Sequence, residues 1–168
     1  MKGRRIFLFF LLGALCVSVM LAAGCSSHGK VVEKYSGLKA QNLLFNRPWL
    51  DEYPSKPEQR FNVYVFSDES IGVHDKADSA YRHLLDIFAF KATPERVQFL
   101  FLHDKRKGDS AYKLERIDKG GQFNLKLTFT SDPQAGGKTY IYFSNLEWSN
   151  REKGTLPMEV RAFIDRLR

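Results

Sequence analysis

The chain has 168 residues, of which 43% are hydrophobic, 14% aromatic and 27% charged. This composition excludes a wholly disordered chain, and the length fits one domain of ordinary size rather than two. The formal net charge is +7, but part of that excess lies in the first few residues, which we expect the mature protein to lose.

The first 25 residues are typical of a secretion signal. Lys2, Arg4 and Arg5 form a basic start, and an uncharged, mainly apolar run follows over residues 6–23. The positive charges stay on the cytoplasmic side while such a run enters the bilayer. Because the run is long enough to span a membrane, an uncleaved anchor helix is the alternative interpretation.

Residues 21–25 have the sequence LAAGC, and Ser26 and Ser27 follow. Small residues before a cysteine resemble the lipobox of bacterial lipoproteins, with Ala22 at the position where that family usually has leucine. The resemblance implies that residues 1–24 are a cleaved signal peptide and that Cys25 carries fatty-acyl groups such as palmitate. Ser26 at the second mature position implies sorting to the outer membrane, with the domain at its periplasmic face or at the cell surface.

Cleavage before Cys25 changes the charge and the redox chemistry of the chain. The loss of the three basic residues of the signal lowers the formal net charge from +7 to about +4, which is too small and too dispersed to indicate nucleic acid. Cys16 leaves with the signal and Cys25 is acylated, so no disulfide is expected in a compartment that permits them. The core alone must stabilise the domain.

The mature chain divides into a tether and one domain. We expect residues 25–41, rich in Ser, Gly and Lys, to be a lipidated tether, and residues 42–168 to form a single β-rich domain. Alternation of apolar and polar residues indicates a pleated, half-buried surface. It predicts strands over residues 61–65, 97–102, 111–117, 123–130 and 139–143. Short connections that contain glycine or proline separate the last four, which favours an antiparallel meander.

Two segments need separate treatment. Residues 79–90 fit the helical period and the strand period alike. We favour a strand because strands flank the segment and sequential strands usually pair, with a helix as the alternative. At the end of the chain, Val160, Phe163, Ile164 and Leu167 follow Pro157 at helical spacing. They predict an amphipathic helix whose apolar stripe lies against a sheet or barrel wall.

Consecutive antiparallel strands and a final amphipathic helix, over about residues 45–168, resemble a small calycin or lipocalin-like barrel. In that family a Gly-x-Trp near the first strand plugs the barrel floor. Trp49 is similarly placed here, with Arg47 in the position of the glycine. The predicted fold is therefore mainly β, an antiparallel meander forming a small barrel or half-barrel with a C-terminal helix. We expect Trp49 to be a structural plug and Trp148 to be partly exposed.

No segment carries a catalytic motif, and we expect no enzyme activity, cofactor or metal. The four histidines, at positions 28, 74, 83 and 103, lack the spacing of a metal site. We interpret His74, Asp75 and Asp78 as part of a solvated loop. His103 and Asp104 are interpreted as a turn pair.

Three further groups have structural interpretations. Asp51 and Glu52 are adjacent, so on an extended segment they point to opposite faces and would not share a substrate. The basic run at 105–107 is interpreted as a solvated hairpin tip, with contact to anionic lipid headgroups as the alternative. The aromatic residues of 139–143 are interpreted as core or interface packing rather than a base-stacking surface.

The predicted function is a membrane-anchored, non-catalytic binding module with no nucleic-acid partner. The ligand is either a lipid or other apolar molecule held inside the sheet, or an envelope protein bound as part of a complex. Composition does not separate these, since a cavity and a packed core are lined by the same side chains; the whole chain has 14 Phe. An internal apolar cavity of at least roughly 300 Å³ would favour the carrier.

Overall fold

The computed structural model describes residues 29–55, 59–67, 70–79, 82–118 and 121–148. In this part of the chain nine strands accompany one α-helix, α1 (Gly37–Leu44), and one 3-10 turn, η1 (Pro133–Ala135). The strands are β1 (Lys30–Tyr35), β2 (Pro48–Leu50), β3 (Phe61–Phe66), β4 (Ile71–Ser79), β5 (Arg82–Ala92), β6 (Arg96–Phe101), β7 (Lys107–Asp118), β8 (Leu125–Asp132) and β9 (Lys138–Ser144).

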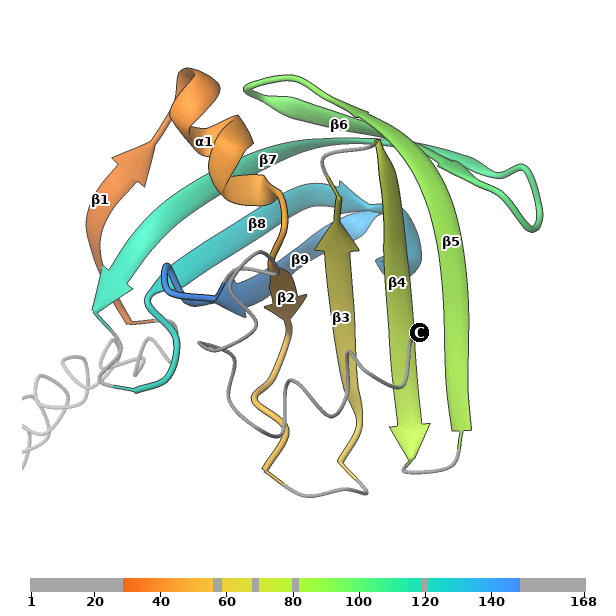
Figure 1. Ribbon diagram of the computed structural model, residues 1–168, viewed down its shortest axis with the longest axis horizontal. Helices are drawn as coiled ribbons and strands as arrows, with labels where there is room; N and C mark the ends of the chain where they lie inside the picture. The colour runs from red at the N-terminus through yellow and green to blue at the C-terminus, as the bar shows by residue number, and fades with distance from the viewer. Residues whose placement is uncertain (1–28, 56–58, 68–69, 80–81, 119–120, 149–168) are drawn as a thin grey trace, which may run out of the picture.

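The strands form a closed antiparallel barrel (Figure 1). Their order is β7-β6-β5-β4-β3-β2-β9-β8, and β7 pairs again with β8 to close a ring of eight strands. The predicted mainly β, antiparallel barrel is confirmed, and it is closed rather than half open. The predicted helix over 155–168 lies outside the described residues.

The sheet begins earlier in the chain than the sequence indicated, with a strand outside the ring of eight. We expected residues 25–41 to be a tether, but β1 pairs with the second half of β7, from Lys30 opposite Asp118 to Tyr35 opposite Leu114. The first half of β7 pairs with β6. The tether interpretation failed here because β1 is an exposed edge strand, whose sequence KVVEKY has no alternation to reveal it.

The ring closes at a short seam between β2 and β9. β2 has three residues and pairs with β9 through Leu50 opposite Phe143. Side chains extend the contact, since Arg47 Nη1 donates to the Asn145 carbonyl oxygen over 3.0 Å. Next to Leu50, Asp51 Oδ2 accepts a hydrogen bond from the Tyr140 hydroxyl over 2.9 Å. Side chains therefore supplement a very short backbone ladder.

Helix α1 packs on one end of the barrel, between β1 and β2 (Figure 1). Its residues Ala40 and Leu44 are buried in the main hydrophobic cluster. Trp49 is 0% exposed in the same cluster, and its indole N–H donates to the Leu44 carbonyl oxygen over 2.9 Å. Gln41 Nε2 donates to the Ala92 carbonyl oxygen and joins the helix to β5. Trp49 thus connects the end of α1 to the barrel interior.

A second apolar cluster lies on the other side of the sheet from this interior. Leu50 and Val63, which are opposite each other in β2 and β3, belong to it, as does Trp148. We expected Trp148 to be partly exposed, but it is 3% exposed, and its ring contacts those of Tyr53 and Phe123. The polar neighbours of Trp148 in the sequence concealed this packing.

Residues 79–90 resolve as a strand, because β5 covers most of them, and this prediction is confirmed. The preceding strand, β4, was missed. We interpreted His74, Asp75 and Asp78 as a solvated loop, but His74 and Asp75 are 3% and 0% exposed and lie in β4. In the described part of the chain, no helix is long and apolar enough to cross a membrane.

Candidate functional site

Aromatic side chains fill the barrel interior around Tyr64. Strand alternation points Tyr64 and Phe66 of β3 inward, and neighbouring strands contribute rings at matching positions. The ring of Tyr64 lies within 4.5 to 6.1 Å, between centroids, of six others: Phe66, His74, Phe88, Phe99, Phe129 and Tyr142. The phenylalanines that could have lined a ligand cavity form a packed core at this level of the barrel.

Asp132 is a fully buried carboxylate at the edge of this core. Tyr64 donates to its Oδ1 over 2.9 Å and Tyr142 to its Oδ2 over 2.7 Å. The backbone N–H of Gln134, in η1, also donates to Oδ1 over 2.8 Å. Burial raises the pKa of both tyrosines, and the charge of Asp132 adds to this effect. The hydroxyls therefore stay protonated and act as donors to the carboxylate.

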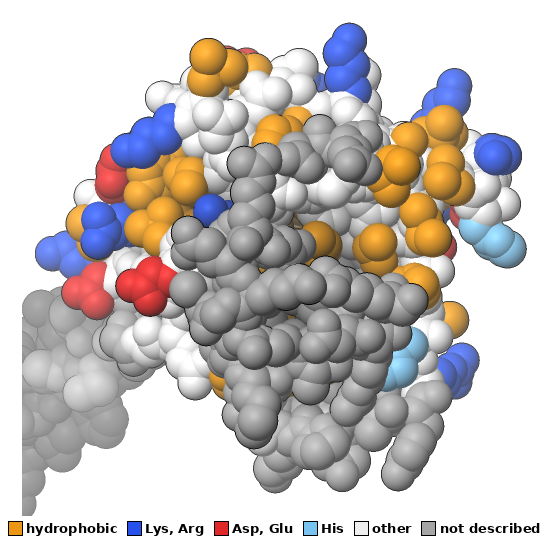
Figure 2. Space-filling model, in the orientation of Figure 1, with side chains coloured by type: hydrophobic (Ala, Val, Ile, Leu, Met, Phe, Trp, Pro, Cys, Tyr) orange, Lys and Arg blue, Asp and Glu red, His pale blue; other side chains and the backbone are white. Residues whose placement is uncertain are grey.

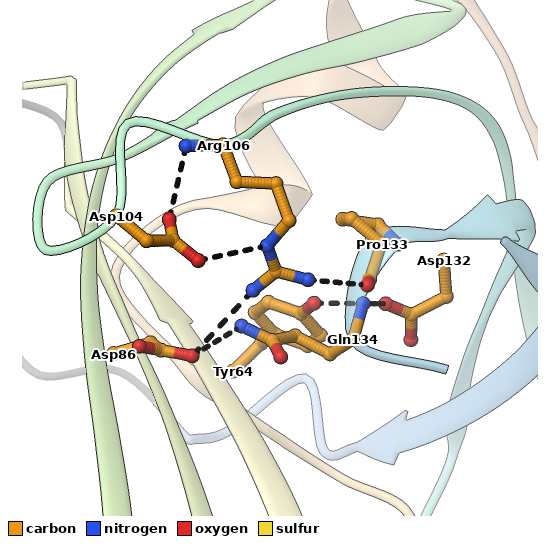
Figure 3. Close-up of polar contacts among 7 residues, drawn as sticks. All are labelled: Tyr64, Asp86, Asp104, Arg106, Asp132, Pro133 and Gln134. Carbon is orange, nitrogen blue, oxygen red and sulfur yellow. Dashed lines mark hydrogen bonds and ion pairs between the residues drawn. The ribbon is translucent and has the colours of Figure 1, made fainter. Parts of the chain in front are cut away.

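The Arg106 side chain contacts three parts of the fold beside Asp132: the β6–β7 turn, the β8–β9 connection and strand β5 (Figure 3). Its Nη1 donates to the Pro133 carbonyl oxygen over 2.9 Å, and its Nε donates to Asp104 Oδ2 over 3.3 Å. Its Nη2 lies 3.8 Å from Asp86 Oδ2, which also accepts a hydrogen bond from Gln134 Nε2. The group holds β5, the β6–β7 turn and the β8–β9 connection together.

The basic residues at 105–107 are exposed where β6 leads into β7, as expected for a solvated hairpin tip. One of them makes further contacts: the Arg106 guanidinium lies over the ring of Phe101, 4.3 Å from its centroid. Asp104, which we expected to form a turn pair with His103, accepts hydrogen bonds from the backbone N–H and the Nε of Arg106. Arg106 is therefore an exposed side chain that is held by several contacts, whereas Lys105 and Lys107, also exposed, take part in no ion pair with another described residue.

His74 lies inside the barrel against Tyr64, with a centroid separation of 4.5 Å. Burial lowers the pKa of His74 to about 3, and the positive charges of Lys76 and Arg106 lower it further. The imidazole is consequently neutral near pH 7. Its Nε2 is buried without a hydrogen-bond partner, so this histidine is a packed core residue.

The neighbouring Asp75 points to the other face of β4. Its Oδ2 lies 2.9 Å from His83 Nδ1. Burial raises the pKa of Asp75, and the contact with His83 offsets part of that shift. Groups of three or more His, Cys, Asp or Glu side chains that could hold a metal do not occur among the described residues.

Asp51 has a structural role at the seam. Its carboxylate accepts hydrogen bonds from the backbone and side chain of Asn62 and from Tyr140. Burial, with a contribution from the Asp51 charge, raises the pKa of Tyr140 to about 12. Glu52 is exposed, as expected for two adjacent residues that do not share a face.

A hollow of about 600 Å³ lies on the outside of β5, β6 and β7 and is open to solvent. Its outward side chains come from three strands in register: Ala89 lies opposite Leu100, and Lys91 lies opposite Gln98. Lys107 lies opposite Leu100 on the other side of β6. The hollow therefore has an apolar floor beside two lysines.

Exposed apolar side chains continue from this floor along β4 and β5. Ile71 lies opposite Ala89 and is 48% exposed, while Leu85, Ile87 and Leu102 are between 40% and 46% exposed. In Figure 2, hydrophobic side chains gather over the region where Figure 1 draws β5 and β6, with basic side chains at the border. We call Ile71, Leu85, Ile87 and Leu102 the apolar stripe.

The sequence did not reveal this surface, because its residues come from separate strands and carry no local motif. Cys25, the predicted lipidation site, lies outside the described residues, and Trp49 lies in the core. Comparisons of the chain with protein-family models, curated proteins and solved structures found no match.

Proposed function

We propose that this chain is an outer-membrane lipoprotein, anchored through acylated Cys25, whose barrel is a non-catalytic binding module with its binding surface on the outside. The observation that supports an outside surface is the filled interior around Tyr64. Six aromatic rings surround Tyr64, and its hydroxyl is bound to buried Asp132. An apolar ligand at this position would have to displace these rings and break that hydrogen bond.

The exterior offers a different kind of surface. Soluble domains seldom expose several large apolar side chains side by side unless the patch is used for binding. The apolar stripe and the adjacent hollow form one such region on β4, β5 and β6. An interaction subunit of an envelope complex fits this surface better than a lipocalin-like carrier does.

The polar groups inside the barrel support a non-catalytic role. The Asp132 carboxylate accepts hydrogen bonds from two tyrosine hydroxyls and a backbone N–H. The Asp51 carboxylate accepts hydrogen bonds from Asn62 and Tyr140. A general acid or base needs a reachable proton and a pKa near the working pH. These carboxylates are engaged in holding strands together.

Native mass spectrometry of the lipidated protein after gentle extraction tests the proposal. We expect a bound envelope protein, and a photo-crosslinking residue at Gln98, in the hollow, should join to the same protein in intact cells. The same residue at Lys113, elsewhere on β7, is the control and should not. A stoichiometric lipid beyond the covalent anchor, with no protein adduct, would favour the carrier and contradict the proposal.

A further inference from the structure

We infer that the hollow on β5, β6 and β7 binds an acidic, amphipathic segment of a partner protein. This inference rests on the proposed function and gives its binding surface and partner chemistry. The ligand would place apolar side chains on Ala89, Leu100 and the apolar stripe, and carboxylates beside Lys91 and Lys107.

The charges around the hollow support an acidic partner. Asp109, which lines the hollow, is bound by Arg96 over 2.9 Å. Arg106 is likewise bound to nearby acids. Three lysines, at positions 91, 105 and 107, are exposed and take part in no ion pair with another described residue. The acid that lines the hollow and the acids beside Arg106 are thus engaged by arginines, whereas the three lysines carry positive charge without such a partner.

The apolar part of the surface is continuous across the strands. Ala89 lies between Ile71 on β4 and Leu100 on β6 in the ladder. Leu102, at the end of β6, donates its backbone N–H to the Ile87 carbonyl oxygen over 2.9 Å. A segment lying across β4, β5 and β6 would therefore meet apolar side chains along its length and lysines at one side. A wide, open surface of this kind suits a protein segment better than a small molecule, which prefers an enclosed cleft.

The position of the hollow favours a protein partner over the anchoring membrane. Lys107 and Asp109 are at the start of β7, whereas β1, the first described strand, pairs with its far end at Asp118. At about 3.3 Å per residue, the length along β7 between its two ends is roughly 35 Å. The proposed lipid attachment precedes β1, so the hollow is at the opposite end of β7 from the anchor.

Fluorescence anisotropy with two labelled peptides tests the inference. In one peptide leucine and glutamate alternate, and in the other lysine replaces glutamate. The protein is the full mature chain with Cys25→Ser. We expect it to bind the acidic peptide and not the basic one, with binding weakened by salt. Lys91→Glu with Lys107→Glu should weaken acidic-peptide binding about tenfold or more, since two attractions become repulsions, and should create binding of the basic peptide.

Lys113→Glu, which reverses an exposed charge further along β7, is the matched control and should bind as the parent does. Thermal melts of all variants verify folding. Equal binding of the two peptides, no binding of either, or an equal loss in the control would overturn the inference. Binding to phosphatidylglycerol vesicles through Lys91 and Lys107 without peptide binding would also overturn it, in favour of a membrane surface. A protein adduct in cells at another face would leave the proposed function standing while this surface failed.

Discussion

The hydroxyl of Tyr64 donates to Asp132 Oδ1 over 2.9 Å and joins two residues that are 68 positions apart. Tyr64 comes from the middle of β3, and Asp132 is the last residue of β8. Both are fully buried. The hydrogen bond therefore crosses the barrel interior and connects the aromatic core to the β8–β9 connection.

Replacing Asp132 by alanine should lower the free energy of unfolding by about 3–5 kcal/mol. The change leaves buried donors of Tyr64, Tyr142 and Gln134 without their acceptor, and each unsatisfied group is costly. Denaturant unfolding measures the loss. Glu52→Ala, at an exposed carboxylate next to Asp51, is the control and should change little. A loss at Asp132 no larger than the control would show that the carboxylate does not hold the core together.

Trp49→Ala should destabilise the domain by about 3–5 kcal/mol, since it empties a fully buried site under α1. Trp49→Phe keeps much of the ring but loses the hydrogen bond to Leu44, so it should cost less. Because Trp148 is also buried, Trp148→Ala should be severe as well. Chemical denaturation compares the three. An unchanged stability in Trp49→Ala, with loss of partner binding, would assign this residue to a binding surface.

Gly72→Ala should be strongly destabilising, although alanine normally suits a strand at least as well as glycine. A Cβ at Gly72 would lie 2.3 Å from the ring of Phe88 and 2.9 Å from the Val65 carbonyl oxygen. Overpacking of this kind costs about 1–3 kcal/mol. A Cβ at Gly121 meets nothing within 4 Å, so Gly121→Ala is the matched control. Equal melting temperatures for the two variants would contradict the close packing of Phe88 on β4.

His74 should make the protein less stable in acid. Burial lowers its pKa to about 3 in the fold, against the ordinary value of 6.5 in an unfolded chain, so between these values the unfolded chain binds more protons. Stability is then lost as the pH falls below about 6.5, by up to about 1.4 kcal/mol per pH unit. His74→Phe removes this contribution and should show a shallower slope in urea melts between pH 7 and pH 4. Parallel slopes for parent and variant would mean that His74 charges without cost in the fold.

Cys25→Ser should leave a full-length precursor that incorporates no labelled palmitate. Globomycin, which blocks the lipoprotein signal peptidase, should also leave a full-length precursor of the parent chain, but that precursor keeps Cys25 and should incorporate the label. Gel mobility and fractionation of the outer membrane give the readout. Processing that continues normally in both cases would contradict the lipobox interpretation and favour an ordinary signal or an uncleaved anchor.

The sequence revealed those strands whose inward positions are apolar. β8 alternates Leu125, Leu127 and Phe129 with polar residues, and all three are buried. β4 was not recognised because its inward positions are Gly72 and His74, and the next residue on that face, Lys76, is exposed. A large ring on β5 needs a glycine opposite it, and His74 is accommodated by stacking on Tyr64.

The candidate surface was harder to predict than the fold. Alternation identifies which residues of a strand face outward, but the lysines that remain unpaired depend on the ionic contacts of Arg96 and Arg106. Arg106 lies in a basic run that looked uniform, yet it is bound to Pro133 across the barrel end. Such contacts depend on the arrangement of distant strands, which local spacing does not contain.

The seam between β2 and β9 has a consequence for how the barrel is assembled. Most neighbouring strands are consecutive in the chain and can pair as hairpins, whereas Arg47 and Asn145 at the seam are 98 residues apart. Closing such a long loop carries the larger entropic cost, and only a three-residue strand compensates for it. We therefore expect the ring to close late in folding. The amide of Leu50 should then exchange with solvent sooner than those in the middle of β8, because the shortest ladder is the first to open.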